Sequence, residues 1–281
     1  MTDSLPSVIV LPGAGGEVPD RAIFAADEDD TTCFHAIGYP GWQRYIAGDF
    51  SAEALVADLA AQIVAKVPHG PIYIVGISFG GHFGYAIALR LRAQGREIGG
   101  LCAIDTFMVG LSAASVGSRA VGALGRGLAF LRKWQIGEFT RLARSLFWRV
   151  LFRQPNFLRV FCARRRLSSV LALDPFFARE LSMRLLIRAA APWIASLDRE
   201  PISLTVPVVL IRTRLIADDD AAWRRRCPDV EIFETTGEHL TLFEPENLGS
   251  FRAAFLAGTR SWRGGNRQRA QARDPLIAPA R

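Results

Sequence analysis

Apolar runs alternate with amphipathic stretches along most of this chain. Short runs with few charges predict buried strands, at Ser7–Leu11, Thr32–Ile37, Pro71–Val75, Gly99–Ile104, Val206–Arg212 and Val230–Glu234. Longer stretches with an apolar residue every third or fourth position predict helices, at Ser51–Val67 with Ser51 as the N-cap, Phe79–Gln94 and Asn247–Ala257. Strands that alternate with helices predict an α/β protein whose mostly parallel sheet carries helices on both faces.

The middle of the chain breaks this alternation. From Phe107 to about Glu200 the signals are helical, and Arg141–Phe152 has one apolar stripe with its arginines off it. An insert of about ninety residues is too long for a passive connection, so we predict a helical lid at about 107–200. The chain is then one domain over residues 1–260, followed by a basic tail at 261–281 without periodicity, which we predict to be disordered.

Two features bear on where the protein works. Val67–Leu89 lacks charged residues and is long enough to span a bilayer, but seven prolines and glycines break it, so we expect a strand, a turn and a helix instead. The four cysteines lie far apart without a Cys-x-x-Cys pair, and Met1–Ser7 shows no secretory signal. These features predict a cytoplasmic enzyme with reduced thiols.

The net charge of +7 is unevenly distributed. Phe107–Val170 holds twelve basic residues against the single acid Glu138, and Arg260–Arg281 holds six arginines against Asp274, so the remainder carries −9. Basic regions favour an acidic partner, a membrane surface or nucleic acid, although arginines also solubilise helices rich in Leu and Phe.

The residues Gly76-Ile77-Ser78-Phe79-Gly80 match the Gly-x-Ser-x-Gly nucleophile elbow. The motif alone is weak and also describes a structural glycine-rich turn. Here an apolar strand precedes it and a helix follows it, which is the context that the elbow requires. We therefore expect Ser78 to project its hydroxyl above the sheet, with the backbone N–H of Phe79 directed into the same space.

A serine nucleophile needs a base, and the chain has four histidines. His35 falls in a predicted strand and His69 in a Pro/Gly turn. His82 lies one helical turn beyond Ser78 and is expected to be packed. His239 follows the last predicted strand and precedes the closing helix, so its loop can reach the carboxyl edge of the sheet. His239 is the predicted base.

The base needs an orienting acid, for which there are two candidates. Asp105 ends the strand that follows the elbow helix. Asp218, Asp219 and Asp220 follow Val206–Arg212, the more usual acid position in this fold, but three consecutive aspartates are typical of a solvated helix start. The order Ser, Asp, His holds for either choice, and we favour Asp105.

The stretch GPIYIVGISFGGHFGYAIALRLRAQGREIGGLCAIDT, together with LPGAGG at Leu11, YPGW at Tyr39 and GEHLTLFEP at Gly237, resembles the thioesterase domains of nonribosomal peptide and polyketide synthesis. The resemblance implies an α/β-hydrolase fold and the triad Ser78, Asp105 and His239. It also implies an oxyanion hole formed by the N–H groups of Phe79 and Ala14.

The resemblance further implies release of an acyl, polyketide or peptidyl chain through an acyl-serine intermediate, by hydrolysis or cyclisation. No metal or diffusible cofactor is expected, and the substrate thiol would be phosphopantetheine on an acidic carrier protein. Because no carrier or condensation domain precedes Leu5, we expect a free-standing enzyme, with peripheral membrane contact left open. The Arg-rich insert and the basic tail depart from the family pattern.

Three other functions are alternatives to a thioesterase. A carboxylester hydrolase of the same fold would use the same residues. A non-catalytic binding protein would not need an intact triad. Nucleic-acid binding through the Arg-rich segments lacks any recognisable binding motif, so we do not expect it.

Overall fold

The computed structural model describes residues 6–25, 32–45, 50–107, 175–199 and 202–262. By its contacts the chain forms two units, residues 1–109 with 182–281, and residues 110–181. The first unit contains the sheet. Of the second unit, the structure describes the first turns of one helix, α8.

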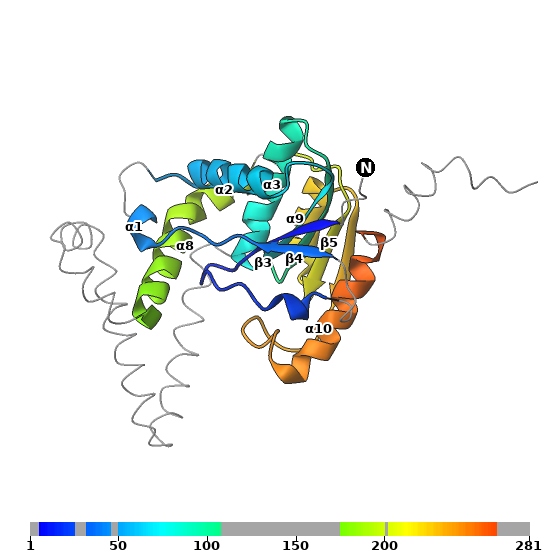
Figure 1. Cartoon of the computed structure of the whole chain (residues 1–281). Coiled ribbons are helices and arrows are strands. Elements are labelled where there is room, and N and C mark those ends of the chain that lie inside the picture. The colour runs from blue at the N-terminus through cyan, green and yellow to red at the C-terminus, as the bar shows by residue number, and fades with distance from the viewer. Residues whose placement is uncertain (1–5, 26–31, 46–49, 108–174, 200–201, 263–281) are drawn as a thin grey trace, which may run out of the picture. The chain divides into compact units, whose positions relative to one another are not determined.

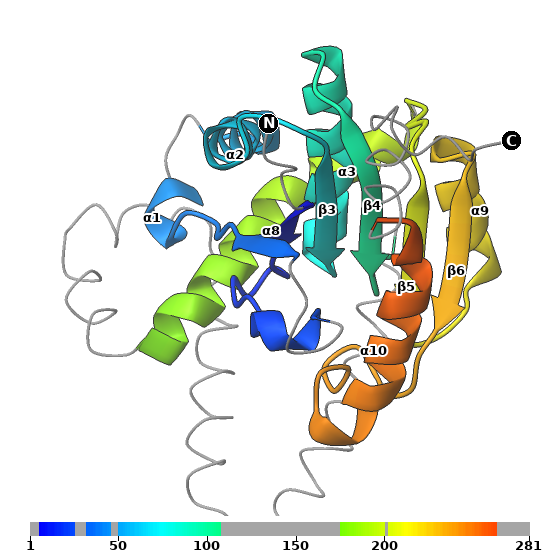
Figure 2. The same cartoon turned by 45° about the vertical axis from the view of Figure 1, so that its right-hand side comes forward.

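Six parallel strands form one sheet in the order β2-β1-β3-β4-β5-β6 (Figures 1 and 2). The strands are β1 (Ser7–Leu11), β2 (Cys33–Ala36), β3 (Ile72–Ile77), β4 (Ile98–Ile104), β5 (Val208–Arg212) and β6 (Val230–Glu234). All six lie within or close to the predicted runs. The α/β class and the mostly parallel sheet predicted from the sequence are confirmed.

The helices in the described ranges are α1 (Trp42–Tyr45), α2 (Ala52–Lys66), α3 (Phe79–Ala93), α8 (Pro175–Arg199), α9 (Ala217–Arg226) and α10 (Pro245–Gly258), with a short 3₁₀ helix at Arg21–Ile23. Ser51 caps α2 as predicted, because its hydroxyl accepts from the Ala54 N–H at 3.0 Å. The sequence pattern did not reveal α1 or the 3₁₀ helix, since three or four residues are too few to show a period.

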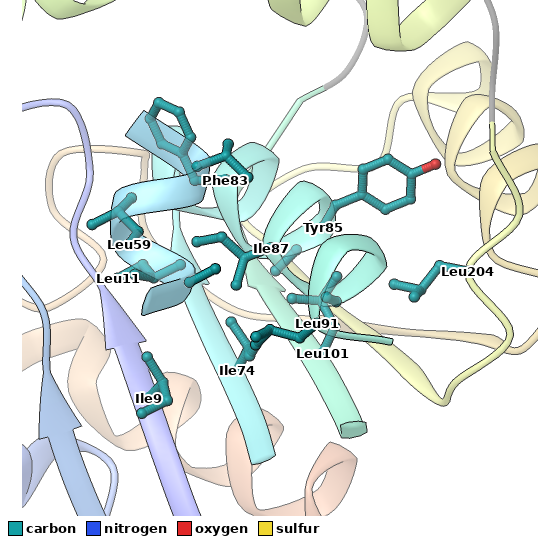
Figure 3. Close-up of a cluster of buried hydrophobic side chains, with 14 of the residues drawn as sticks. Ile9, Leu11, Leu59, Ile74, Phe83, Tyr85, Ile87, Leu91, Leu101 and Leu204 are labelled. Carbon is teal, nitrogen blue, oxygen red and sulfur yellow. The ribbon is translucent and has the colours of Figure 1, made fainter. Parts of the chain in front are cut away.

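Helices cover both faces of the sheet, as the sequence predicted. Figure 2 shows α3 on one face and α10 on the other. The core on the α3 face joins residues of α2, α3 and α9 to β1, β3, β4 and β5; Figure 3 shows part of it, including Ile9, Leu59, Ile74, Phe83 and Leu101. On the α10 face, Phe24, Phe251 and Phe255 pack against the other side of the same strands. Because both faces are covered, every residue of β3 is buried.

The charge-free stretch Val67–Leu89 proves to be the turn before β3, β3 itself and most of α3, as expected from its prolines and glycines. None of the helices in the described ranges combines the length and the apolar character that crossing a bilayer requires.

The predicted insert at about 107–200 falls mostly on residues 108–174, which lie outside the described part, as does Arg141–Phe152. Its last segment is the helix α8. The tail predicted at 261–281 also lies outside the described part, except Ser261 and Trp262. Both are helical, and Trp262 is buried against Tyr73 with ring centroids 5.0 Å apart. The indole of Trp262 lies over the space left open by Gly100.

Candidate active site

Ser78 occupies the tight turn between β3 and α3. Its backbone has φ 51° and ψ −113°, a conformation that costs about 1–3 kcal/mol and survives only where the surroundings enforce it. Glycines allow the close packing around this turn: a Cβ at Gly76 would lie 2.4 Å from the Gly80 carbonyl oxygen, and one at Gly80 would lie 2.5 Å from that of Pro12. The Ser78 hydroxyl caps no backbone N–H of α3. It is therefore available for another partner.

That partner is His239. The loop between β6 and α10 brings its Nε2 to 2.9 Å from the Ser78 Oγ. The loop is fixed by its own contacts, since the Glu238 N–H donates to the Thr241 Oγ1 at 2.9 Å and Asn247 donates to the Thr241 carbonyl at 3.0 Å. The imidazole remains 45% exposed, so a substrate can reach it.

Asp105 completes the arrangement from the end of β4. Its Oδ2 lies 2.6 Å from the His239 Nδ1, while its Oδ1 accepts from the Thr213 N–H at 3.1 Å and from the Thr213 hydroxyl at 2.9 Å. The carboxyl is 2% exposed. Burial by itself raises the pKa of Asp105, but the hydrogen bonds from His239 and Thr213 outweigh it and hold that pKa below its ordinary value. Asp105 is thus held ionised, as a group that orients an imidazole must be.

The alternative acid candidates have other partners. Asp218 is exposed, whereas Asp219 is fully buried and forms an ion pair with Arg212, with Asp220 3.6 Å from the same guanidinium. These aspartates begin α9, so a helix start was rightly expected. The expectation that this start is solvated is wrong for Asp219, because Arg212 at the end of β5 is buried and requires a counter-charge.

The other histidines lie where their sequence context suggested. His69 is exposed, and His35 in β2 is partly buried with its Nε2 3.3 Å from the Cys33 Sγ. His82 is packed in α3, 3% exposed and edge-on to Phe79. Burial, together with the nearby Arg226 and Arg212, lowers the pKa of His82 to about 3.

The neutral state of His82 predicts a pH dependence of stability. The unfolded chain protonates this imidazole below about pH 6.5, whereas the folded chain resists protonation down to about pH 3, so stability falls as the pH falls through that window. The loss amounts to about 2 kcal/mol between pH 6.5 and pH 5. Urea unfolding from pH 8 to pH 5 should therefore show a shallower loss of unfolding free energy for His82→Gln than for the wild type. Equal losses in the two proteins would show that His82 titrates normally in the fold.

The glycine-rich turn after β1 lies against the nucleophile. A Cβ on Gly13 would be 3.6 Å from the Ser78 Cβ, and the Gly16 N–H closes the turn by donating to the Gly13 carbonyl at 2.9 Å. The Tyr39 hydroxyl anchors the turn from outside through the Pro12 carbonyl, at 2.7 Å. Ala14 lies within this turn and Phe79 is the first residue of α3, whose N–H has no partner within a helix. Their assignment as oxyanion donors stays a prediction.

The sequence did not reveal Thr213, which holds the Asp105 carboxyl, or the bond from Arg212 to the carbonyl of Thr106, the residue after Asp105. One signal pointed to them: Arg212 is the single charged residue in an otherwise apolar run. A guanidinium at the end of a buried strand must find acceptors, and those acceptors mark a place where neighbouring segments are fixed to one another. In the described part of the chain, no three His, Cys, Asp or Glu side chains come together as a metal site.

Comparisons with known proteins give a consistent result. The family model for the thioesterase domain matches residues 6–133. Enterobactin synthase component F of Escherichia coli K12 is 43% identical over 47 residues, which cover 17% of this chain and 4% of that protein. A non-reducing polyketide synthase of an Arthrinium species is 34% identical over 106 residues, 37% of this chain and 5% of that protein. The chain thus spans a small part of the curated relatives that it matches.

Solved structures of thioesterase domains share the fold. The NocB thioesterase domain in covalent complex with a fluorophosphonate nocardicin G analogue superposes with a TM-score of 0.56 at 18% identity, covering 91% of this chain and 95% of that one. The wild-type Vlm2 thioesterase domain superposes with a TM-score of 0.57 at 20% identity, covering 90% and 93%. The resemblance stated from the sequence motifs and the α/β-hydrolase fold that it implies are confirmed.

Proposed function

We propose that this protein releases an acyl, polyketide or peptidyl chain from a phosphopantetheine carrier, because its residues 6–133 match the family model for the thioesterase domain. The observation that carries the proposal is the unbroken hydrogen-bonded series from Ser78 through His239 to Asp105, at 2.9 Å and 2.6 Å. The strained turn at Ser78 supports it, because backbone strain of this kind gathers at functional sites.

The proposed reaction has two steps. The His239 Nε2 takes the proton as the Ser78 Oγ attacks the thioester carbonyl, and the Asp105 carboxylate stabilises the imidazolium that forms. The imidazolium then gives its proton to the leaving thiolate, and Ser78 holds the acyl group as an ester. Water opens that ester, or an internal hydroxyl or amine does so when the product is cyclic.

The oxyanion of each tetrahedral intermediate would lie against the N–H groups of Phe79 and Ala14. Removing one donor from such a pair typically lowers kcat by about a hundredfold or more. The mechanism requires no metal and no diffusible cofactor, because the nucleophile, base and electrophilic donors all come from the chain.

The choice of substrate rests on the relatives. The matched proteins include enterobactin synthase component F and a non-reducing polyketide synthase, and a four-domain nonribosomal peptide synthetase superposes on 92% of this chain with a TM-score of 0.55. We propose a carrier protein as the partner. Its acidic surface would complement the Arg-rich insert, which lies outside the described residues.

We also propose a cytoplasmic location. Among the described cysteines, Cys33, Cys102 and Cys227 are free thiols, which agrees with this proposal.

The proposal is tested against the carboxylester alternative by steady-state kinetics. The same acyl group is offered as an N-acetylcysteamine thioester and as a p-nitrophenyl ester. We expect the higher kcat/KM for the thioester, although p-nitrophenolate is the better leaving group. A clear preference for the oxygen ester would assign the protein as an esterase of the same fold.

A further inference from the structure

Thr106 connects the two strand ends that carry Ser78 and Asp105. It is 1% exposed and follows Asp105 directly. Its hydroxyl donates to the backbone carbonyl of Ser78 at 2.7 Å, across the sheet from β4 to β3. Thr106, the residue directly after Asp105, is thus hydrogen-bonded to the backbone of Ser78.

The fit around Thr106 is close on the side of the nucleophile. A Cβ at position 81 would lie 2.1 Å from the Thr106 Oγ1 and 2.7 Å from its Cγ2, so glycine is required where α3 passes this side chain. The Gly81 N–H also donates to the Ser78 carbonyl, at 3.1 Å. The carbonyl of Ser78 therefore accepts from both groups, one in its own helix and one in the neighbouring strand end.

On its other side Thr106 is bonded to β5 and α9. Its carbonyl accepts from the Arg212 guanidinium at 2.6 Å and from the Trp223 indole at 3.2 Å. Arg212 is fully buried and forms its ion pair with the equally buried Asp219. The Cζ of Arg212 also lies over the Phe107 ring, 4.7 Å from the ring centroid. A buried ion pair of this kind holds one geometry, because either partner alone would be an uncompensated charge.

We propose that Thr106 is a positioning residue, whose hydroxyl fixes the Ser78 backbone relative to Asp105 while Arg212 and Asp219 fix Thr106. This inference rests on the proposed function, since it assigns a role within the same reaction. The geometry of such a site must be held to within about half an ångström, and a misplacement of about 1 Å can lower the rate a hundredfold. Thr106 does not touch the reacting atoms, so its effect passes through Ser78.

The test uses two variants that separate the hydroxyl of Thr106 from its methyl group. Thr106→Val keeps the shape and removes the donor, whereas Thr106→Ser keeps the donor and loses a methyl group. For an acyl thioester we expect Thr106→Val to lower kcat by about ten- to a hundredfold with KM changed by less than about twofold. Thr106→Ser should recover kcat to within about threefold of the wild type. If Thr106→Val does not fold, Thr106→Ala replaces it, because a smaller side chain fits the same space.

A second readout separates this inference from the proposed function. A serine-directed fluorophosphonate is reacted with each protein, and the labelled peptide and the labelling rate constant are measured. The wild type should be labelled at Ser78, and the variant without the hydroxyl should be labelled more slowly by about the factor seen in kcat. A wild type that is not labelled at Ser78 overturns the proposed function. A wild type labelled at Ser78, with valine or alanine variants that match it in both kcat and labelling, overturns the role of Thr106 alone.

Discussion

Replacement of Ser78 by alanine is expected to lower kcat for an acyl thioester by about a millionfold, the scale of nucleophile loss in other serine hydrolases. The fold should survive the change. Alanine keeps the Cβ, so the strain at φ 51° is unchanged, and the lost hydroxyl caps no backbone N–H of α3. Thioester turnover and thermal unfolding, measured side by side, check both parts of this prediction.

Ser51→Ala is the matched control for that variant. Ser51 accepts from the Ala54 N–H at the start of α2, so its loss should lower stability by about 1 kcal/mol and leave kcat unchanged. A Ser78→Ala protein that keeps more than about a hundredth of the wild-type kcat would place the nucleophile elsewhere.

Asp105→Asn is expected to lower kcat by about ten-thousandfold. The reason lies in the two donors that Thr213 offers to the Asp105 Oδ1. An asparagine will keep its oxygen toward Thr213 and turn its NH₂ group toward the His239 Nδ1. That nitrogen must then accept, so the proton moves to Nε2, and the imidazole can no longer take the proton of Ser78.

Asp218→Asn is the control for the acid, because Asp218 is an exposed aspartate at the alternative position. It should keep kcat within about twofold of the wild type. Asp219→Asn is a poor control, since it leaves Arg212 without its buried counter-charge and is expected to lower stability. An Asp105→Asn protein with more than about a tenth of wild-type kcat would move the orienting acid elsewhere.

The sheet could be predicted well from the sequence, because each strand is a short apolar run followed within a few residues by polar residues, glycine or proline. Gly76, Ser78 and Gly80 mark the elbow, and the carboxyl ends of neighbouring parallel strands meet at one edge. That rule places Asp105 after β4 on the same edge as Ser78 after β3, and the two strands are neighbours in the sheet. His239 could be identified as the base only by elimination among four histidines. Its location in a loop at the same edge of the sheet could be predicted, because it follows the last strand.

Two kinds of feature could not be predicted. The pairing of Arg212 with Asp219 depends on which side of α9 turns inward, and three consecutive aspartates give no period to read. The burial of Trp262 depends on Gly99 and Gly100, two residues in β4 more than 160 positions away, whose missing side chains leave space for Tyr73 and Trp262. Contacts of this kind are fixed by the assembled fold and leave no local pattern.

The central claim is that Ser78 carries the acyl group between the two steps. Rapid quenching of the wild type with an acyl N-acetylcysteamine thioester, followed by peptide mass spectrometry, tests it most directly. We predict the mass of one acyl group on the peptide that contains Ser78, formed before steady-state product release and absent from Ser78→Ala. An acyl group found on another side chain, such as the exposed thiol of Cys33, or product formed with no acylated peptide at any quench time, would contradict the account.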